Sequence, residues 1–221
     1  NGEAYPNIVA AGDNACILHY RASDAELREG QLVLVDAGCE VDCYASDITR
    51  TFPAGGRFSA EQRALYDVVL QAQLEALSAT RPGATVVGVH EVALGVLVRG
   101  LLELGLLEGS QEQVLESKSY RRFYMHRTSH WLGLDVHDCG AYTHAGRSRS
   151  LEPGMVLTIE PGLYVAPDDE TVEPRWRGIG VRIEDDALVT PDGHEILTGG
   201  APKAAEEVEQ ACTRRPLVAV P

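Results

Sequence analysis

The sequence predicts an α+β fold in which helices pack on one face, the outer face, of a curved antiparallel sheet. Two consecutive helical segments lie near the middle of the chain, and β-rich segments precede and follow them. Strands are expected within 8–18 and 31–52 before the helices, and within 120–197 after them. Such a separation of strands from helices is typical of α+β domains.

The first β-rich region is expected to bend and then to set one acidic residue apart. An apolar run at 32–35 enters it, and residues 37–40 mark a bend between two extended segments. Beyond the bend, Asp47, Thr49 and Thr51 alternate with bulkier residues. Strand alternation would therefore give Asp47 a face separate from its bulky neighbours.

Both central helices begin at recognisable capping residues. Ser59 and Gln62 form a capping box, which predicts a helix through about Thr80, where a following Pro-Gly pair ends it. Thr85 caps the second helix, which is expected to run to about Gly105.

Turns divide the β-rich region after the helices. They are expected at the Pro-Gly and Asp-Gly signals near 152–154, 160–162 and 191–193. A last helix is expected over 202–212, followed by a frayed tail over 214–221.

The composition is that of an acidic globular chain. With 19 Lys and Arg against 33 Asp and Glu, the formal net charge is −14, which argues against nucleic acids and anionic membranes as partners. Charged residues interrupt the most apolar segment, 86–107, so a buried helix is expected there rather than a membrane span. The five scattered cysteines do not resemble a disulfide framework, and the cytoplasm is the expected compartment. Cys39 and Cys43 do not complete a zinc site, because no second ligand pair follows them.

Four acidic residues and one histidine stand where strand-like sequence calls for an apolar side chain. Asp36 and Asp47 lie in the first β-rich region, Glu160 and Glu184 lie in the second, and His130 lies in HRTSHWLGLDVHD. Taken singly, such an acid is explained by a turn or an ion pair, and such a histidine by a hydrogen bond in the core. Together they favour one shared site, because buried carboxylates repel one another unless cations lie between them.

A dinuclear metal centre would remove this repulsion. Two divalent cations neutralise four carboxylates, and a set of carboxylate oxygens with one imidazole suits Mn²⁺, with Co²⁺, Fe²⁺ and Zn²⁺ as alternatives. Two ions that share bridging carboxylates can bind a water between them, lower its pKa and present hydroxide to a carbonyl carbon. The residues alone thus point to metal-assisted hydrolysis.

The order and surroundings of these residues resemble those of the pita-bread metallopeptidases. The five ligand candidates lie in VDAG, SDITRTF, TSHWLGLDVHD, TIEPGLY and GIGVRIEDD. In combination these motifs are most similar to the catalytic domain of the Xaa-Pro aminopeptidase (aminopeptidase P) branch of peptidase family M24, from about Tyr5 to about Lys203. The resemblance implies one pita-bread domain over 1–221. It also implies hydrolysis of the bond between a first residue and a proline in second position.

The resemblance assigns a role to each of the five ligand candidates. Asp36 would bind one metal ion and His130 the other, while Asp47 and Glu184 would bridge both ions. Glu160 would be a ligand that also takes the proton from the attacking water.

Four further residues match positions that the family uses around its metals. His19 and His137 match histidines that line the substrate site and help to manage protons. His126 matches another active-site histidine, and Arg182 matches an arginine that organises the site.

The substrate expected from the resemblance is a peptide whose proline ring needs a shaped, apolar pocket. Trp131, Tyr164 and the stem of Arg147 are expected to shape it, with core packing as the alternative for Trp131 and Tyr164. No role is assigned to the remaining histidines, His90, His144 and His194.

The sequence departs from the family pattern in two ways. Arg127 follows the first histidine of its motif, where many members have glycine. Full-length members also have an N-terminal domain and opening helices before the segment that resembles Tyr5 and Pro6. We therefore expect a catalytic domain truncated at its N-terminus that lacks some of the packing behind activity, and a homo-oligomeric full-length parent.

Two other functions remain open at this point. Prolidase, which cleaves Xaa-Pro dipeptides, shares the metal set, although WLG after His130 and the GIGVRIEDD segment favour aminopeptidase P. Some pita-bread proteins are binding modules without metal activity, but those lose ligands, and none of the five is substituted here. Methionine aminopeptidase is disfavoured because the chain shows no signature of that branch.

Overall fold

The computed structural model of the chain describes residues 2–22 and 24–213. Its helices are α1 (Ala60–Ala79), α2 (Val86–Glu103), α3 (Gln111–Ser117) and α4 (Ala205–Thr213). Short 3-10 helices are η1 (Gly12–Cys16), η2 (Ser119–Arg122) and η3 (Pro174–Trp176). The tail expected to fray, 214–221, lies outside the described residues.

Both central helices begin where the sequence predicts. The Ser59 hydroxyl accepts a hydrogen bond from the Gln62 N–H, and the Gln62 side chain accepts one from the Ser59 N–H at 2.9 Å. The Thr85 hydroxyl caps α2 in the same way, through an N–H of the first turn. Helix α3 has no counterpart among the predicted elements, although Ser110 and Gln113 form a further capping box before it.

The first sheet has the order β2-β3-β6, formed by β2 (Ile8–Ala11), β3 (Leu32–Ala37) and β6 (Ile48–Pro53). Beyond the bend, the β3–β6 hairpin continues as β4 (Cys39–Val41) and β5 (Tyr44–Ala45), and β1 (Gly2–Glu3) pairs with β4. The strand predicted over 8–18 ends at Ala11. Gly12 takes a positive φ of 56° there and starts η1 instead.

The second β-rich region is built on one long hairpin. Its strands are β9 (Val156–Ile159), β10 (Gly162–Val165), β11 (Ile179–Arg182), β12 (Asp185–Thr190) and β13 (Gly193–Ile196). Strand β10 pairs with β11, and β9 pairs with β12, which also pairs with β13; all these pairings are antiparallel. The first strands of this region in the described chain are β7 (Thr143–His144) and β8 (Arg147–Ser148), which pair as a small hairpin. The region therefore begins later than the predicted residue 120.

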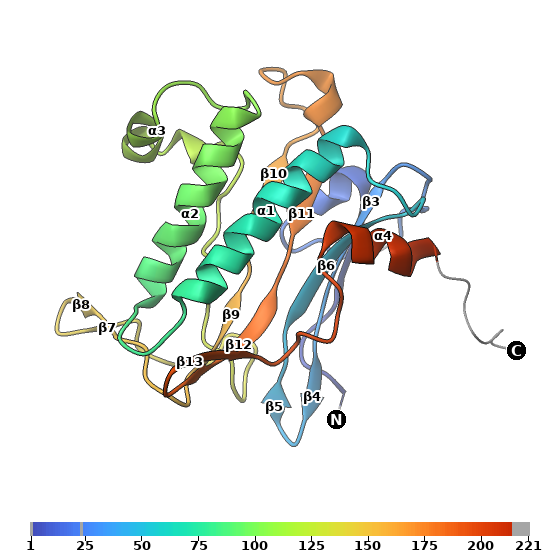
Figure 1. Cartoon of the computed structure of the whole chain (residues 1–221). Coiled ribbons are helices and arrows are strands. Elements are labelled where there is room, and N and C mark those ends of the chain that lie inside the picture. Colours follow the sequence, from blue (N-terminus) through green and yellow to red (C-terminus); the bar gives the residue numbers. More distant parts are fainter. Residues whose placement is uncertain (1, 23, 214–221) are drawn as a thin grey trace, which may run out of the picture.

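The helices cover one face of the strands. Helices α1 and α2 lie side by side in front of β9, β10 and β11, and α4 packs beside β6 (Figure 1). The main core between these layers includes Leu65, Val69, Leu97, Leu157 and Val181, all fully buried. The predicted α+β class is confirmed.

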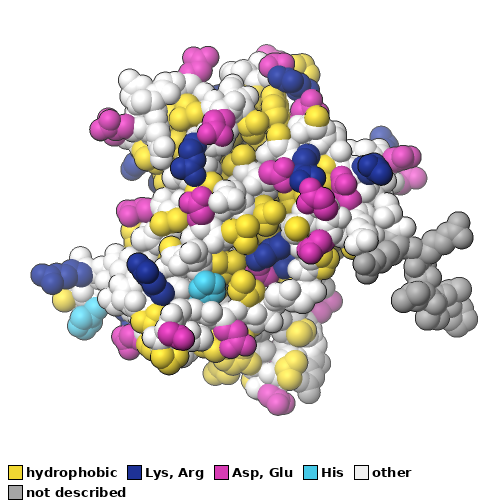
Figure 2. Space-filling model, viewed as in Figure 1, with side chains coloured by type: hydrophobic (Ala, Val, Ile, Leu, Met, Phe, Trp, Pro, Cys, Tyr) yellow, Lys and Arg dark blue, Asp and Glu magenta, His cyan; other side chains and the backbone are white. Residues whose placement is uncertain are grey.

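The helical face of the molecule is mixed in charge. Acidic and basic side chains are interspersed there, with hydrophobic side chains between them (Figure 2). None of the described helices is both long and apolar enough to cross a membrane.

Candidate metal centre

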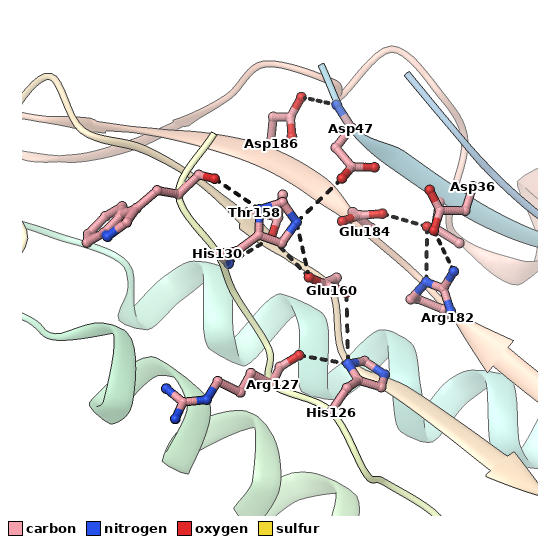
Figure 3. Close-up of polar contacts among 12 residues, drawn as sticks. Asp36, Asp47, His126, Arg127, His130, Thr158, Glu160, Arg182, Glu184 and Asp186 are labelled. Atoms are coloured by element: carbon pink, nitrogen blue, oxygen red, sulfur yellow. Dashed lines mark hydrogen bonds and ion pairs between the residues drawn. The ribbon is translucent and has the colours of Figure 1, made fainter. Parts of the chain in front are cut away.

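The structure brings the five ligand candidates together from five separate segments (Figure 3). Asp36 lies on β3, Asp47 lies immediately before β6, and His130 lies in the loop that precedes β7. Glu160 follows β9, and Glu184 precedes β12. Asp47, His130 and Glu184 each offer a ligand atom, and these three atoms lie within 4.8 Å of one another.

A break in the long hairpin positions the two glutamates. Strands β9 and β10 are separated by residues 160–161, and the opposite arm is interrupted at 183–184, so both breaks lie at the same level. The Glu184 N–H donates across to the carbonyl of Thr49 on β6, at 3.1 Å, rather than to its own hairpin. The sequence predicted Glu184 in the middle of a strand. Glu184 lies in this break instead, because its N–H bonds to the other sheet and not to the opposite arm of its own hairpin.

Asp47 also lies outside a strand. The prediction that strand alternation gives it a face of its own is therefore wrong. It occupies the junction between β5 and β6, and its N–H donates to the carboxylate of Asp186 at 3.0 Å. Because the backbone is anchored at this point, the Asp47 side chain is held beside His130, whose Nε2 lies 3.4 Å from Asp47 Oδ2.

His130 connects the two acids that flank it. Its Nε2 lies 3.5 Å from Glu160 Oε1 and, as noted, close to Asp47. Burial lowers the pKa of His130, but the hydrogen bond to Asp47 and the negative charge of Glu160 outweigh burial and raise it to about 9. Thr158 supports this pair, because its hydroxyl accepts from the His130 N–H at 3.1 Å and donates to Glu160 at 3.2 Å.

The acidic residues are held in a place that disfavours their charge. Burial raises the pKa of Glu160 to about 7, although nearby positive charge lowers it. Burial, followed by the negative charges of Asp47 and Glu160, raises the pKa of Glu184 well above its usual value. Burial also raises the pKa of Asp36, and Arg182 opposes that rise. When ionised, these carboxylates therefore repel one another at positions that are largely buried.

Arg182 and His126 form a second layer behind the acids. The Arg182 guanidinium donates to Asp36 Oδ2 at 2.5 Å and to the Tyr164 hydroxyl at 3.0 Å. The Tyr164 hydroxyl lies 2.8 Å from His126 Nε2, and His126 Nδ1 lies 2.7 Å from the carbonyl of Arg127. Burial, reinforced by the charge of Arg182, lowers the pKa of His126 to about 3. A neutral His126 fits both contacts if Nδ1 donates to Arg127 and Nε2 accepts from Tyr164.

The acids open into a cavity of ≈ 820 Å³. His19 and His137 lie on its wall, both with exposed side chains, and the His137 ring lies edge-on to His130 with centroids 4.4 Å apart. Tyr164 lies behind the wall as a fully buried residue.

The structure places two of the expected substrate residues elsewhere. Trp131 is buried and stacks on Tyr142 with ring centroids 5.3 Å apart, so it packs in the core. Arg147 is exposed in the β7–β8 hairpin. Neither belongs to the described residues that line the cavity, so their predicted role in shaping the proline pocket gains no support from this geometry.

The comparisons with known proteins agree on one family. The sequence model of metallopeptidase family M24 matches residues 1–191. The chain belongs to metallopeptidase family M24. The Xaa-Pro aminopeptidase of Escherichia coli (strain K12) is 50% identical over 212 residues, which cover 95% of this chain and 48% of that protein.

Solved structures of relatives confirm the pita-bread fold of this M24 chain. The structure of Pseudomonas aeruginosa aminopeptidase PepP matches with a TM-score of 0.95 and 56% identity, over 96% of this chain and 48% of that one. The structure of E. coli aminopeptidase P with the inhibitor Pro-Leu matches with a TM-score of 0.92 and 50% identity, over the same shares. The chain thus spans about half the length of the relatives it matches.

The donor set of this M24 chain fits divalent metal ions. Carboxylate oxygens and one imidazole nitrogen converge on one space, which is the set that hard and borderline divalent ions prefer. Among the described residues, Arg182 is the single arginine or lysine in an ion pair with the four acids. Bound cations would neutralise the negative charge of the four acids that Arg182 does not compensate.

Four residues of the site were not singled out from the sequence. The Tyr5 hydroxyl lies within hydrogen-bond distance of Asp36 and Asp47, and the Thr49 hydroxyl donates to Glu184 Oε2 at 2.5 Å. Burial raises the pKa of Tyr5, so its hydroxyl keeps its proton. Thr158 and Asp186 are the other two. Thr49 and Asp186 are polar residues within strand-like sequence, and this pattern could have marked them as candidate site residues. The sequence around Tyr5 contains no such pattern.

Proposed function

We propose that this chain carries the catalytic centre of an Xaa-Pro aminopeptidase, which releases the first residue of peptides that have proline second. The observation that supports this most is the convergence of Asp36, Asp47, His130, Glu160 and Glu184 at the base of one cavity. The relatives named Xaa-Pro aminopeptidase provide the substrate class.

The five ligand residues would hold two divalent ions, Mn²⁺ in the first instance and Co²⁺, Fe²⁺ or Zn²⁺ as alternatives. Asp36 and His130 would each bind one ion, and Asp47 and Glu184 would bridge both. When bound, the pair would polarise the scissile carbonyl and lower the pKa of a water molecule.

Glu160 would be the proton carrier of the reaction. Its carboxylate lies 3.5 Å from His130 Nε2 and accepts a hydrogen bond from Thr158, so it is held in a fixed position in the site, as a general base requires. We propose that Glu160 takes a proton from the attacking water and delivers it to the proline nitrogen as the peptide C–N bond breaks. Arg182 would hold Asp36, and neutral His126 would hold the Arg127 segment.

The cavity offers a surface for the proline side of the substrate. Ile8, Leu18, Val136 and Tyr142 contribute its apolar and aromatic lining. His19 and His137 would contact the peptide backbone at the rim. The inhibitor Pro-Leu bound by E. coli aminopeptidase P presents a proline at one end, in keeping with such a subsite. A cytoplasmic location and a homo-oligomeric parent are further parts of the proposal.

Hydrolysis of matched peptides tests this function. The chain is stripped of metal, reloaded with Mn²⁺, and assayed with an Xaa-Pro-Xaa tripeptide and an Xaa-Pro dipeptide. Metal-dependent cleavage of the tripeptide is expected. Cleavage of the dipeptide alone would assign the chain to prolidase, and binding without any cleavage would indicate an inactive binding module.

A further inference from the structure

A second cavity, of ≈ 320 Å³, adjoins the catalytic cavity. His126, Arg127 and Ser129 line both cavities, so this short segment forms the boundary between them. The rest of the described lining of the second cavity comes from α2, the segment before the boundary and Thr128: Val86, Val87, His90, Tyr120, Arg121, Tyr124, Met125 and Thr128. Any ligand that crosses the boundary would therefore pass Arg127.

The two cavities differ in their charged lining. Asp36, Asp47, Glu160 and Glu184 line the catalytic cavity together with Arg21, Arg127 and Arg182, whereas none of the described residues that line the second cavity is acidic. The second cavity instead has two arginines, Arg121 and Arg127, set among Val86, Val87, Tyr120 and Met125. In a protein with a net charge of −14, a cavity whose charged lining consists of arginines alone is a distinct feature.

Neither arginine of the second cavity is neutralised within the described structure. Arg122, the neighbour of Arg121, pairs with Asp169 at 2.6 Å, but no ion pair or side-chain hydrogen bond is formed by Arg121 or Arg127. The backbone of Arg127 is fixed, because its carbonyl lies 2.7 Å from His126 Nδ1. Its side chain extends away from His126 and from the acids (Figure 3). The backbone of Arg127 is therefore fixed beside the catalytic cavity, and its exposed side chain has no ion-pair or hydrogen-bond partner among the described residues.

We propose that Arg127, assisted by Arg121, forms an anion subsite that binds a carboxylate carried by the substrate peptide beyond its proline. The inference rests on the proposed function, because an aminopeptidase substrate has its cationic amino end at the metal side. Such a peptide directs its negative end away from the metal side and towards the arginines, whose charge is complementary to a carboxylate.

The distances are compatible with a short peptide. His126 Nδ1 lies 3.8 Å from Glu160 Oε2, so the boundary segment starts next to the reacting groups. Each residue of extended chain adds at most about 3.6 Å. The proposal places the carboxylate on the first or second residue after the proline. It is either the C-terminal carboxylate of a short peptide or an acidic side chain, both of which form charge-assisted hydrogen bonds with a guanidinium.

Three peptides of equal length separate these sources: Gly-Pro-Gln amide, which is neutral after the amino terminus, Gly-Pro-Gln with a free C-terminus, and Gly-Pro-Glu amide. Their affinities are measured by calorimetry with the metal-free full chain, so that no peptide is consumed. At least one of the two anionic peptides is expected to bind about tenfold more tightly than the amide of Gln, the size of one charge-assisted hydrogen bond.

Variants locate the effect. Arg127→Gln is expected to reduce the preference for anionic peptides to less than about twofold, and Arg127→Lys to retain part of it, since a lysine keeps the charge without the forked geometry. Arg99→Gln is the matched control, because Arg99 is an exposed arginine of α2 that pairs with Glu75 at 3.6 Å. With the Mn²⁺-loaded chain, Arg127→Gln should raise KM for the anionic peptides by a larger factor than KM for the neutral amide.

The outcomes separate this inference from the proposed function. Equal affinity of the wild-type chain for all three peptides would overturn the anion subsite, whether or not the loaded chain cleaves them. A preference that persists in Arg127→Gln would also overturn it. A preference that depends on Arg127, in a chain that cleaves no Xaa-Pro peptide, would support the subsite and refute the proposed activity.

Discussion

The environment of Glu160 contains groups that favour its protonated form and groups that favour its ionised form. It lies 3.5 Å from His130 and 3.8 Å from His126, and it accepts a hydrogen bond from Thr158. Desolvation favours its protonated form, while His130 and Arg182 favour the ionised form, so its pKa of about 7 reflects two opposing effects. A group in this balance can exchange protons at neutral pH with little cost.

Replacing Glu160 by glutamine keeps its shape and removes its proton exchange. We expect Glu160→Gln to lower kcat of the Mn²⁺-loaded chain by about 100-fold or more, the range of general acid-base catalysis. Peptide affinity should change far less. Glu152→Gln, at an exposed turn, is the control. Because Glu160 is also a proposed ligand, metal content is measured in parallel; full activity with Glu160→Gln would contradict the role of this residue.

The residues of the site differ in how far the sequence could identify them. Asp36, Asp47, Glu160 and Glu184 each break an apolar pattern, and a buried charge without a partner is costly, so the sequence alone indicates a shared site. Tyr5 is different, because a tyrosine near the start of a strand is ordinary. Its contact with Asp36 and Asp47 arises from the pairing of β1 with β4, which local sequence does not encode.

The elements show the same limit in another form. The starts of α1 and α2 could be predicted, because capping is decided by residues three positions apart. The break at 160–161 could be predicted as well, because it lies within the turn signal at 160–162. The break at 183–184 could not, because it depends on a bond from the Glu184 N–H to Thr49, which lies 135 positions away in a different sheet.

Gly38 is the position where the first hairpin depends most on the absence of a side chain. A Cβ at Gly38 would lie 1.7 Å from the carbonyl oxygen of Ser46 and 2.9 Å from the ring of Tyr5. We expect Gly38→Ala to lower the free energy of unfolding by about 3 kcal/mol, as for an overpacked site whose backbone has to move. Urea unfolding measures this change.

Gly193→Ala serves as the comparison for that substitution, because no atom lies within 4 Å of the Cβ it would add. A displaced Gly38 segment would also shift Asp36, two residues before it, and Asp47, which follows Ser46 on the opposite arm. Gly38→Ala should therefore bind Mn²⁺ more weakly than Gly193→Ala. Equal stability of the two variants would mean that the close approach of the hairpin arms is not maintained in solution.

At the scale of the whole molecule, the metal centre is a concentration of unfavourable charge within the fold. The two sheets and their helices bring together acids that would separate in the unfolded chain. Metal-free protein therefore retains protons that the unfolded chain has lost. Burial raises the pKa of Glu160 and that of Asp186 to about 7, and it raises the pKa of Glu184 well above its usual value. Folding and metal binding are thus linked.

This linkage predicts how stability depends on pH. Above pH 7 the unfolded chain has ionised acids and neutral histidines, whereas the metal-free folded chain still holds a proton on His130, whose pKa is about 9, and in part on Glu160 and Asp186, whose pKa values are about 7. The folded state binds more protons, so its stability falls as pH rises, by about 1.4 kcal/mol per pH unit for each proton retained. We expect urea unfolding with a chelator to show a loss of about 1–3 kcal/mol between pH 7 and 8.5. Saturating Mn²⁺ should abolish this loss, because cations then replace the protons; a metal-free chain of constant stability over this interval would refute the buried, repelling cluster.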